Sequence, residues 1–252
     1  MNGLYVDTGK KCPTAVVDGY IKDGRLYLRI MDYKSGKKSF SLSDVWNGLN
    51  MQLIIYLYAL QQEGLARYRE KLTREIDEIR PAGVLYVPVR DPIPDAARGE
   101  DDAVLHDLRA RALRRSGLLS DDIDLLEAME KGLAGDCRFI PVRIKMAKPT
   151  KKNPEPTPEL SALSSVASLE RFGRLARYTQ KKLAEMGREL LAGSVQADPC
   201  VQGGVAQCEF CDYRAACGFD ESAGDQYRPL KKWKDGEVWD KLEGKDHDQV
   251  DK

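Results

Sequence analysis

Asp32 and Lys34 stand two residues apart at the end of an apolar segment, in the sequence RIMDYKSGKK. Carboxylate oxygens are the ligands that Mg²⁺ and Mn²⁺ prefer, and a neighbouring ammonium group favours the charged oxygens of a phosphate. The pair therefore indicates metal-assisted hydrolysis of a phosphate ester, in which Asp32 holds the cation and Lys34 offsets charge developing on the phosphate. Solvated charges at the end of a strand are the alternative interpretation, because an acid-x-Lys tripeptide alone is a weak pattern.

The residues around Asp32 read as a β-hairpin. Residues 15–21 and 25–33 are rich in β-branched, aromatic and aliphatic side chains, and they flank an Asp-Gly pair that suits a tight turn. Along the second strand, the period of two puts Leu28, Ile30, Asp32 and Lys34 on one face, so the charges are expected to point where the core points. Asp18, on the first strand, is the candidate for a second metal-binding carboxylate.

A helix is expected after the hairpin, capped by Ser43 and running to about residue 62. Gln52 and Tyr56 lie one turn apart on it and are predicted to face the same site, although Tyr56 also suits a core position. Further helices are expected at residues 100–116, 120–131 and 168–192. The segments VLYVPV and RFIPVRIK are expected to be strands.

The composition is that of a globular chain that does not enter a membrane. The 252 residues, with 42% hydrophobic and 32% charged side chains, can form one core or a core with a small satellite. Forty basic and forty acidic residues leave no net charge, so a polyanion would have to be held by a local patch. No segment approaches the roughly 20 apolar residues of a membrane span, and the N-terminal residues lack the apolar core of a signal peptide. We therefore expect a cytoplasmic protein.

Four of the six cysteines crowd together at Cys200, Cys208, Cys211 and Cys217. In a reducing compartment this distribution favours a metal over disulfides. A zinc ribbon would normally offer a second Cys-x2-Cys pair or histidines, which this segment lacks. A 4Fe-4S cluster held by Cys208, Cys211 and Cys217 fits better, with Cys200 as the nearest candidate for the fourth ligand. Zinc and free structural cysteines stay open as alternatives.

Several segments resemble a known family. IMDYKSGKKSFSLSDVWNGLNMQLIIYLYAL resembles motifs II and III of the RecB-like PD-(D/E)xK nucleases, and CEFCDYRAACGFD resembles the iron-sulfur signature of that branch. PAGVLYVPVRDP and the segment from SSVASLERF to GRELLAG resemble the AddB-type nuclease domains of bacterial helicase-nucleases. Cas4-like nucleases share the fold and the cysteine triplet and are the second candidate within the family.

The resemblance implies an α/β fold with a restriction-endonuclease-like core, in which helices flank a mixed sheet and a cysteine cluster follows. We expect a nuclease-like domain over residues 1–224, including the iron-sulfur cysteines at 200–217, and a polar tail over 225–252. The implied activity is Mg²⁺- or Mn²⁺-dependent, exonuclease-type cleavage of a DNA strand emerging from a helicase in double-strand-break repair, with an AddA-like helicase as the partner. Asp32 and Lys34 match the acid-x-Lys motif, and Gln52 and Tyr56 match the Gln-x-x-x-Tyr motif.

Two positions depart from the family pattern. Aligned on Asp18, the first metal-binding aspartate of the family falls on Ala15, so Asp18 would have to replace it through a slip of three residues in the hairpin. The fourth cluster cysteine of the family lies well upstream of the nuclease core, so Cys200 or Cys12 would have to stand in. Two hypotheses follow: a metal-dependent DNA nuclease, and a non-catalytic iron-sulfur DNA-binding or scaffold domain of the same fold.

Overall fold

The chain forms two compact units. The computed structural model describes residues 4–5, 15–36, 38–68, 76–89, 92–93, 95–147 and 156–244. The first unit, called the sheet unit below, comprises residues 1–40 and 52–176, and the second, called the cysteine unit, comprises residues 41–51 and 177–252. The second unit includes residues 225–244 together with the cysteine segment, and the expected domain boundary at residue 224 stays a prediction.

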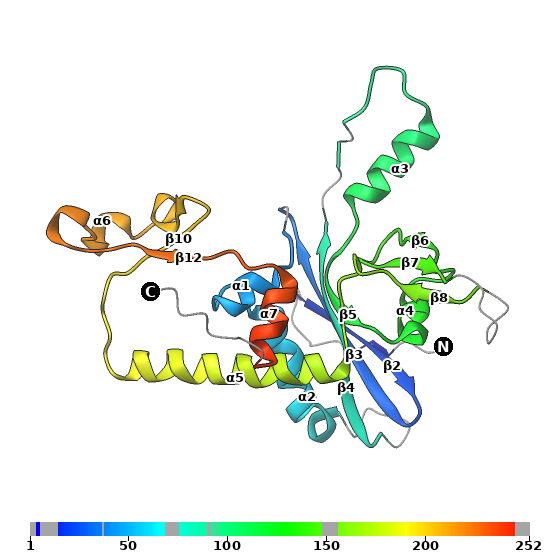
Figure 1. Ribbon diagram of the computed structural model, residues 1–252, viewed down its shortest axis with the longest axis horizontal. Coiled ribbons are helices and arrows are strands. Elements are labelled where there is room, and N and C mark those ends of the chain that lie inside the picture. Colours follow the sequence, from blue (N-terminus) through cyan, green and yellow to red (C-terminus); the bar gives the residue numbers. More distant parts are fainter. Residues whose placement is uncertain are drawn as a thin grey trace. The chain divides into compact units, whose positions relative to one another are not determined.

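A six-stranded mixed sheet forms the centre of the sheet unit (Figure 1). In spatial order its strands are β1 (Leu4–Tyr5), β2 (Ala15–Lys22), β3 (Arg25–Lys34), β4 (Glu78–Pro88), β5 (Ser116–Ser120) and β9 (Val166–Ala167). β3 and β4 are parallel, whereas β2 with β3 and β4 with β5 are antiparallel. Together with the flanking helices, this mixed sheet confirms the expected α/β class.

The β2–β3 hairpin has the predicted two-residue turn. Asp23 and Gly24 have φ angles of 51° and 70°. This left-handed conformation is tolerated by Asp and Gly and matches the right-handed twist of the flanking strands. Lys22 consequently pairs with Arg25, and the same pairing continues without a slip to Ala15 opposite Asp32. The turn therefore fixes which side chains face each other near the predicted site.

The two faces of the sheet pack against different partners. Met31 of β3 joins a core formed by Leu85, Leu119 and residues of a second, smaller sheet. The alternate residues of β3, among them Leu28 and Ile30, are also buried. They lie on the opposite face because side chains alternate along a strand. The helix α2 (Gln52–Tyr68) packs on β3 and β4.

The helix α5 (Leu169–Leu191) belongs to both units, with its residues up to Ala176 in the sheet unit. Within that unit, the buried Tyr58 hydroxyl of α2 donates a 2.6 Å hydrogen bond to the Phe172 carbonyl of α5. The predicted helix at residues 168–192 is confirmed. Among the residues that the structure covers, no helix combines the length and the apolar composition needed to cross a membrane.

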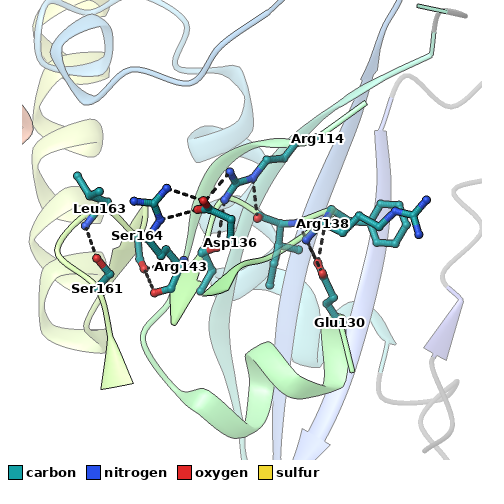
Figure 2. Close-up of polar contacts among 11 residues, drawn as sticks. Arg114, Glu130, Asp136, Arg138, Arg143, Ser161, Leu163 and Ser164 are labelled. Atoms are coloured by element: carbon teal, nitrogen blue, oxygen red, sulfur yellow. Dashed lines mark hydrogen bonds and ion pairs between the residues drawn. The ribbon is translucent and has the colours of Figure 1, made fainter. Parts of the chain in front are cut away.

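The smaller sheet of the sheet unit is held by charged side chains. Its strands are β6 (Gly135–Asp136), β7 (Arg143–Met146) and β8 (Pro158–Leu160), and the nearby helices are α3 (Asp102–Ala112) and α4 (Ile123–Met129). Figure 2 shows Arg143 clamping Asp136, with a 2.6 Å bond from Nε to Oδ1. Glu130 accepts hydrogen bonds from three successive backbone N–H groups, those of residues 138–140. Arg114 donates to the carbonyls of Ile140 and Val142 at 3.1 and 3.0 Å.

The cysteine unit consists of short elements. These are α1 (Leu42–Trp46), β10 (Cys200–Gln202), β11 (Val205–Ala206), η2 (Gln207–Phe210), α6 (Arg214–Cys217), η3 (Glu221–Ala223), β12 (Arg228–Leu230) and α7 (Asp235–Leu242), together with the C-terminal part of α5. The α7 helix buries Val238 and Trp239 and contacts α1. The rings of Trp46 and Tyr178 stack 4.7 Å apart, so α1 also packs on α5.

Some predicted elements differ from the structure. The helix expected from Ser43 to residue 62 is two helices, because the chain turns through left-handed Gly48 and Asn50; α1 is capped by Ser41 instead. Between the helices expected at 100–116 and 120–131 lies the strand β5, which was not expected from the sequence. Of the segment RFIPVRIK, only the last three residues, 143–145, lie in a strand, which is β7.

Candidate active site

Asp32 occupies a fully buried position near the end of β3. Its backbone is in register with Ala15 of β2 on one side and Tyr86 of β4 on the other, and its relative exposure is 0%. Lys34 Nζ lies 2.8 Å from Asp32 Oδ2, which confirms that the two side chains share a face. The ion pair is not aligned as a hydrogen bond, and neither carboxylate oxygen accepts one from a donor within the described part of the chain. A buried anion in this state is costly unless a cation or another donor completes its surroundings.

Lys34 pairs with the buried carboxylate and also lines an open cleft. Its side chain is 33% exposed, and Nζ lies 5.9 Å from the centre of the Tyr86 ring. The cleft has a volume of about 340 Å³ and is lined by Lys34, Gly36, Lys38, Ser39, Tyr86, Pro88, Arg111, Ala112, Arg114 and Ser116. Four of these residues are basic and none is acidic, so the cleft next to the Asp32–Lys34 pair favours an anion.

Gln52 and Tyr56 lie on the first turns of α2 and bind each other. Gln52 Nε2 donates to the Tyr56 hydroxyl at 3.0 Å, and both side chains are exposed. The exposure of Tyr56 excludes the alternative that it belongs to the core. The residues that line the Lys34 cleft do not include either of them. The structure thus brings Gln52 to Tyr56, while their predicted contact with the Asp32 site stays a prediction.

Asp18 lies away from Asp32. The hairpin register places Asp18 opposite Arg29, three positions from the partner of Asp32 and therefore on the other face of the sheet. Its carboxylate forms an ion pair with Arg29, which is only 5% exposed and also stacks on the Tyr20 ring at 5.5 Å. The expectation that Asp18 and Asp32 share a metal therefore conflicts with this geometry, because the Asp-Gly turn does not allow the slip of three residues.

Arg115 lies within electrostatic range of the Arg29–Asp18 pair. Burial, and then the positive charge of Arg29, lower the pKa of the Arg115 guanidinium. Burial also raises the pKa of the Tyr20 hydroxyl. These groups form a partly buried polar cluster on the face opposite Asp32.

The family model that describes the PD-(D/E)XK nuclease superfamily matches residues 14–218 of the chain. The chain belongs to this superfamily. The match spans the hairpin with Asp32 and Lys34, the helix with Gln52 and Tyr56, and all four cysteines of the C-terminal group.

Curated relatives match nearly the whole chain. Proteins named as one subunit of an ATP-dependent helicase/deoxyribonuclease are 34% identical over 223 residues in Clostridium tetani, 32% over 247 residues in Clostridium kluyveri and 30% over 239 residues in Thermoanaerobacter sp.. The alignments cover 88, 96 and 93% of this chain but only 18, 20 and 19% of the relatives. The chain thus spans about a fifth of the length of these relatives.

The position opposite Asp32 has no acidic residue in this PD-(D/E)XK chain. Ala15, where the family resemblance predicts the first metal-binding aspartate, is the cross-strand partner of Asp32. Side chains at directly paired positions of an antiparallel ladder lie within about 5.5 Å of each other at Cβ. The departure from the expected family pattern thus falls at the position directly paired with Asp32.

Three of the predicted cluster cysteines meet at one cavity. Cys208, Cys211 and Cys217 line a pocket of about 240 Å³ together with Arg214, Phe219, Asp220, Glu221 and Tyr227. Cys200 begins β10, where it pairs with Arg228, and does not line this pocket. No three His, Cys, Asp or Glu side chains of the described residues are close enough to hold a single metal ion. The alternative fourth ligand, Cys12, lies outside the described residues.

The basic residues of the Lys34 cleft were not predicted from the sequence. Arg111 and Arg114 come from the end of α3 and the residues that follow it, and Lys38 follows β3. The two arginines are three residues apart within the expected helix at residues 100–116, and this spacing puts them on one side of that helix. It is the sequence feature from which their shared position could have been predicted. Their approach to Lys34 depends on the strand β5, which was not predicted.

Proposed function

We propose that this chain is the nuclease domain of an AddB-type helicase-nuclease and hydrolyses phosphodiester bonds of DNA with Mg²⁺ or Mn²⁺. The observation that carries the proposal is the Asp32 carboxylate, which is fully buried, paired with Lys34 at 2.8 Å and otherwise without a hydrogen-bond donor among the described residues. The deoxyribonuclease named in the relatives supports DNA as the substrate.

The donor groups suit a hard divalent cation. Both Asp32 oxygens lack a hydrogen-bond partner within the described structure, and the carbonyls of the following strand residues offer further oxygen ligands. The cation, when bound, supplies a Lewis acid and a water of lowered pKa. Asp18 is engaged by Arg29 and position 15 is alanine, so we expect Asp32 to be the main protein carboxylate and the affinity for metal to be weak.

The remaining roles belong to side chains with fixed positions. Lys34 is held on the face of Asp32 and opens into the basic cleft, so its ammonium group can stabilise negative charge on a phosphate without reorganising. Gln52 and Tyr56 form a pair at the start of α2, and we propose that they orient the substrate or the attacking water. Tyr86, buried beside Asp32, excludes water from one side of the carboxylate.

Ala15→Asp is the decisive variant. Cleavage of a labelled single-stranded oligonucleotide is measured for the natural chain, Ala15→Asp, Asp32→Asn and Lys34→Ala over a range of Mg²⁺ and Mn²⁺ concentrations. We expect slow cleavage by the natural chain at high metal concentration, faster cleavage at lower metal concentration by Ala15→Asp, and a loss of about 10² to 10³ in rate for the other two variants. Equal rates for the natural chain and Asp32→Asn would overturn the proposal.

A second function is favoured by the alanine at position 15. If the natural chain binds DNA without cutting it and Ala15→Asp cuts, the chain is a catalytically degenerate DNA-binding or scaffold domain of the nuclease fold. This outcome would keep the assignment of Asp32 and Lys34 as the site and would remove the activity from the natural chain.

The cysteine segment is proposed to hold a 4Fe-4S cluster. Three thiols that line one pocket support this proposal. Cys200 would have to move to supply the fourth ligand. Iron and sulfide after anaerobic reconstitution test this assignment, and stoichiometric zinc without iron would contradict it.

The partner we propose is an AddA-like helicase that delivers the single strand, because the relatives are longer proteins named as part of a helicase/deoxyribonuclease. The described cysteines are all free, which fits a reducing cytoplasm. Co-purification with a tagged helicase tests this partner. If the two proteins did not bind each other at micromolar concentration, the proposed partnership would be contradicted.

A further inference from the structure

The cleft beside Lys34 borders a larger cavity. This second cavity has a volume of about 550 Å³ and is lined by His106, Asp107, Ala110, Arg111, Arg114, Asp136, Cys137 and Arg138. Arg111 and Arg114 line both cavities. The two cavities are therefore adjacent, and together they are called the basic groove below, whose lining runs from Lys34 past α3 to the turn between β6 and β7.

The groove has an excess of positive charge, although the net charge of the whole chain is zero. Its lining contains five basic residues, Lys34, Lys38, Arg111, Arg114 and Arg138, and two acidic ones, Asp107 and Asp136. The whole chain has 40 basic and 40 acidic residues. A local excess of this kind is the electrostatic footprint of a polyanion rather than a property of the average surface.

The two arginines that line both cavities differ in how firmly they are held, since Arg114 is fixed by backbone carbonyls and Arg111 is exposed. Arg114 is fixed by the carbonyls of Ile140 and Val142, and its remaining nitrogen lies 3.9 Å from Asp136 (Figure 2). Arg111 is 76% exposed, and its bond to Asp107 is an exposed ion pair between residues four apart on α3. Such surface pairs are weak, so a phosphate can compete for Arg111 at little cost.

An aromatic residue stands next to the far part of the groove. The guanidinium of Arg138 lies over the Phe139 ring at 5.2 Å, and Arg138 also approaches the ring nitrogens of His106 at 3.4 Å. Phe139 is 43% exposed, although it is fully apolar. A groove of positive charge with an exposed ring beside it has the parts that single-stranded nucleic acid uses, since unpaired bases stack on aromatic side chains.

We infer that the basic groove binds the sugar-phosphate backbone of a single DNA strand on its way to the Asp32–Lys34 site, with Arg111 and Arg138 on phosphates and Phe139 beneath an unpaired base. This inference rests on the proposed function, because it takes the strand to be the one that the site cuts. It extends the binding surface to α3 and the small sheet, well beyond the acid-x-Lys and Gln-x-x-x-Tyr residues.

The test measures binding without cleavage. Fluorescence anisotropy of a labelled 20-nucleotide single strand in EDTA is recorded at several salt concentrations for the natural chain, Arg111→Ala, Arg138→Ala, Phe139→Ala and Arg109→Ala. Arg109 is the matched control, since it is exposed on the same helix and does not line the groove. Native circular dichroism of each variant shows that the fold is kept.

We expect Arg111→Ala and Arg138→Ala to weaken binding about tenfold and to lower the slope of log affinity against log salt by about 0.7 each, because one phosphate contact is lost. Phe139→Ala should weaken binding about tenfold with an unchanged slope, and Arg109→Ala should leave both quantities unchanged. The groove proposal would be wrong if Arg111→Ala and Arg138→Ala bound the strand as tightly as the natural chain. It would also be wrong if Arg109→Ala lost as much affinity as these two variants. Tighter binding of a duplex together with no effect of Phe139→Ala would overturn the single-strand assignment.

The proposal that the groove binds DNA and the proposal that the chain hydrolyses DNA can be contradicted independently. A chain that never cuts DNA, but whose binding in EDTA depends on Arg111 and Arg138, supports the groove and contradicts the nuclease activity. A chain that cuts DNA and binds it equally well without these arginines supports the activity and contradicts the groove.

Discussion

The Asp32–Lys34 site and the cysteine pocket are built in opposite ways. Asp32 lies in a strand with hydrogen-bonded neighbours on both sides, and its side chain is completely buried. Cys211 and Cys217 are exposed, and with Cys208 they come from a four-residue 3₁₀ helix, a four-residue α-helix and the turn between them. The sheet therefore positions its site before any ligand arrives, whereas the proposed cluster would have to bring the thiols of the cysteine pocket to their final positions.

The two designs place their energetic costs differently. At the sheet site, folding buries a carboxylate with one ion-pair partner, so the folded state carries a destabilising group that the proposed metal would relieve. At the cysteine pocket, nothing of comparable cost is buried, and the binding energy of a cluster would be spent on ordering the segment. The same type of substitution, such as Gly→Ala or Cys→Ser, should therefore change the free energy of unfolding by different amounts in the two regions.

Gly117→Ala should have the largest effect on stability. A Cβ at Gly117 would stand 1.9 Å from the Val84 carbonyl oxygen and 2.9 Å from the Leu85 Cα, so β4 and β5 would have to separate next to the site. We expect a loss of about 3 kcal/mol or more in the free energy of unfolding, measured by urea denaturation.

Gly187→Ala is the matched control in the cysteine unit. Gly187 lies within α5, and an added Cβ there meets nothing within 4 Å apart from its chain neighbours and the backbone of α5 itself. Its replacement should stabilise the helix by about 0.5 to 1 kcal/mol. A loss at Gly187 as large as that at Gly117 would show that the contrast in rigidity between the two regions does not exist.

At pH 8, the thiols of Cys211 and Cys217 should react with iodoacetamide about a hundredfold or more faster than the thiol of Cys137. Burial, followed by the charge of Glu130, raises the pKa of the Cys137 thiol to about 11, whereas Cys211 and Cys217 are exposed. Since the thiolate is the nucleophile, Cys137 should react slowly with iodoacetamide until pH approaches its pKa or the chain unfolds. Site-resolved mass spectrometry measures the rates. Rapid labelling of Cys137 in the folded chain would mean that the core around β7 opens readily.

The sequence predicts the sheet site better than its surroundings, for physical reasons. The Asp-Gly turn fixes the hairpin register locally: once Lys22 faces Arg25, Ala15 must face Asp32 and Asp18 must face Arg29. The same arithmetic excludes Asp18 as a partner of Asp32, so this correction was within reach of the sequence. The period of two also predicted the shared face of Asp32 and Lys34 correctly.

The elements that could not be predicted from the sequence are those set by distant contacts. β5 is only five residues long, contains Gly117 and two serines, and is a strand because β4 and β9 flank it. The basic groove depends on β5 and on the clamp between Arg143 and Asp136, which joins residues of separate strands. Neither periodicity nor spacing contains that information, because local propensity is weak where tertiary packing decides.

Asp32→Asn should stabilise the metal-free protein by about 1 to 2 kcal/mol, since a neutral amide costs less to bury than a carboxylate. Urea denaturation in EDTA measures the difference. With Mn²⁺ added, the natural chain should gain stability and Asp32→Asn should not, because only a site that binds the folded state shifts the equilibrium. A variant that is less stable than the natural chain in EDTA would instead identify the Asp32–Lys34 ion pair as a stabilising structural contact.

The smallest effect on stability is expected for the combined change Cys208→Ser, Cys211→Ser and Cys217→Ser. These side chains line an open pocket in short elements, so the iron-free protein should change by less than about 0.5 kcal/mol. The same change at Cys137, which is 4% exposed within the core of the small sheet, should cost about 1 to 3 kcal/mol, because a hydroxyl replaces a thiol in apolar surroundings. After anaerobic reconstitution, the triple variant should lose the iron chromophore and the added thermal stability that the natural chain gains, whereas Cys137→Ser should keep both. A triple variant that unfolds without iron present would show that the cysteines are packed into their unit rather than waiting for a ligand, and the contrast with the sheet site would be wrong.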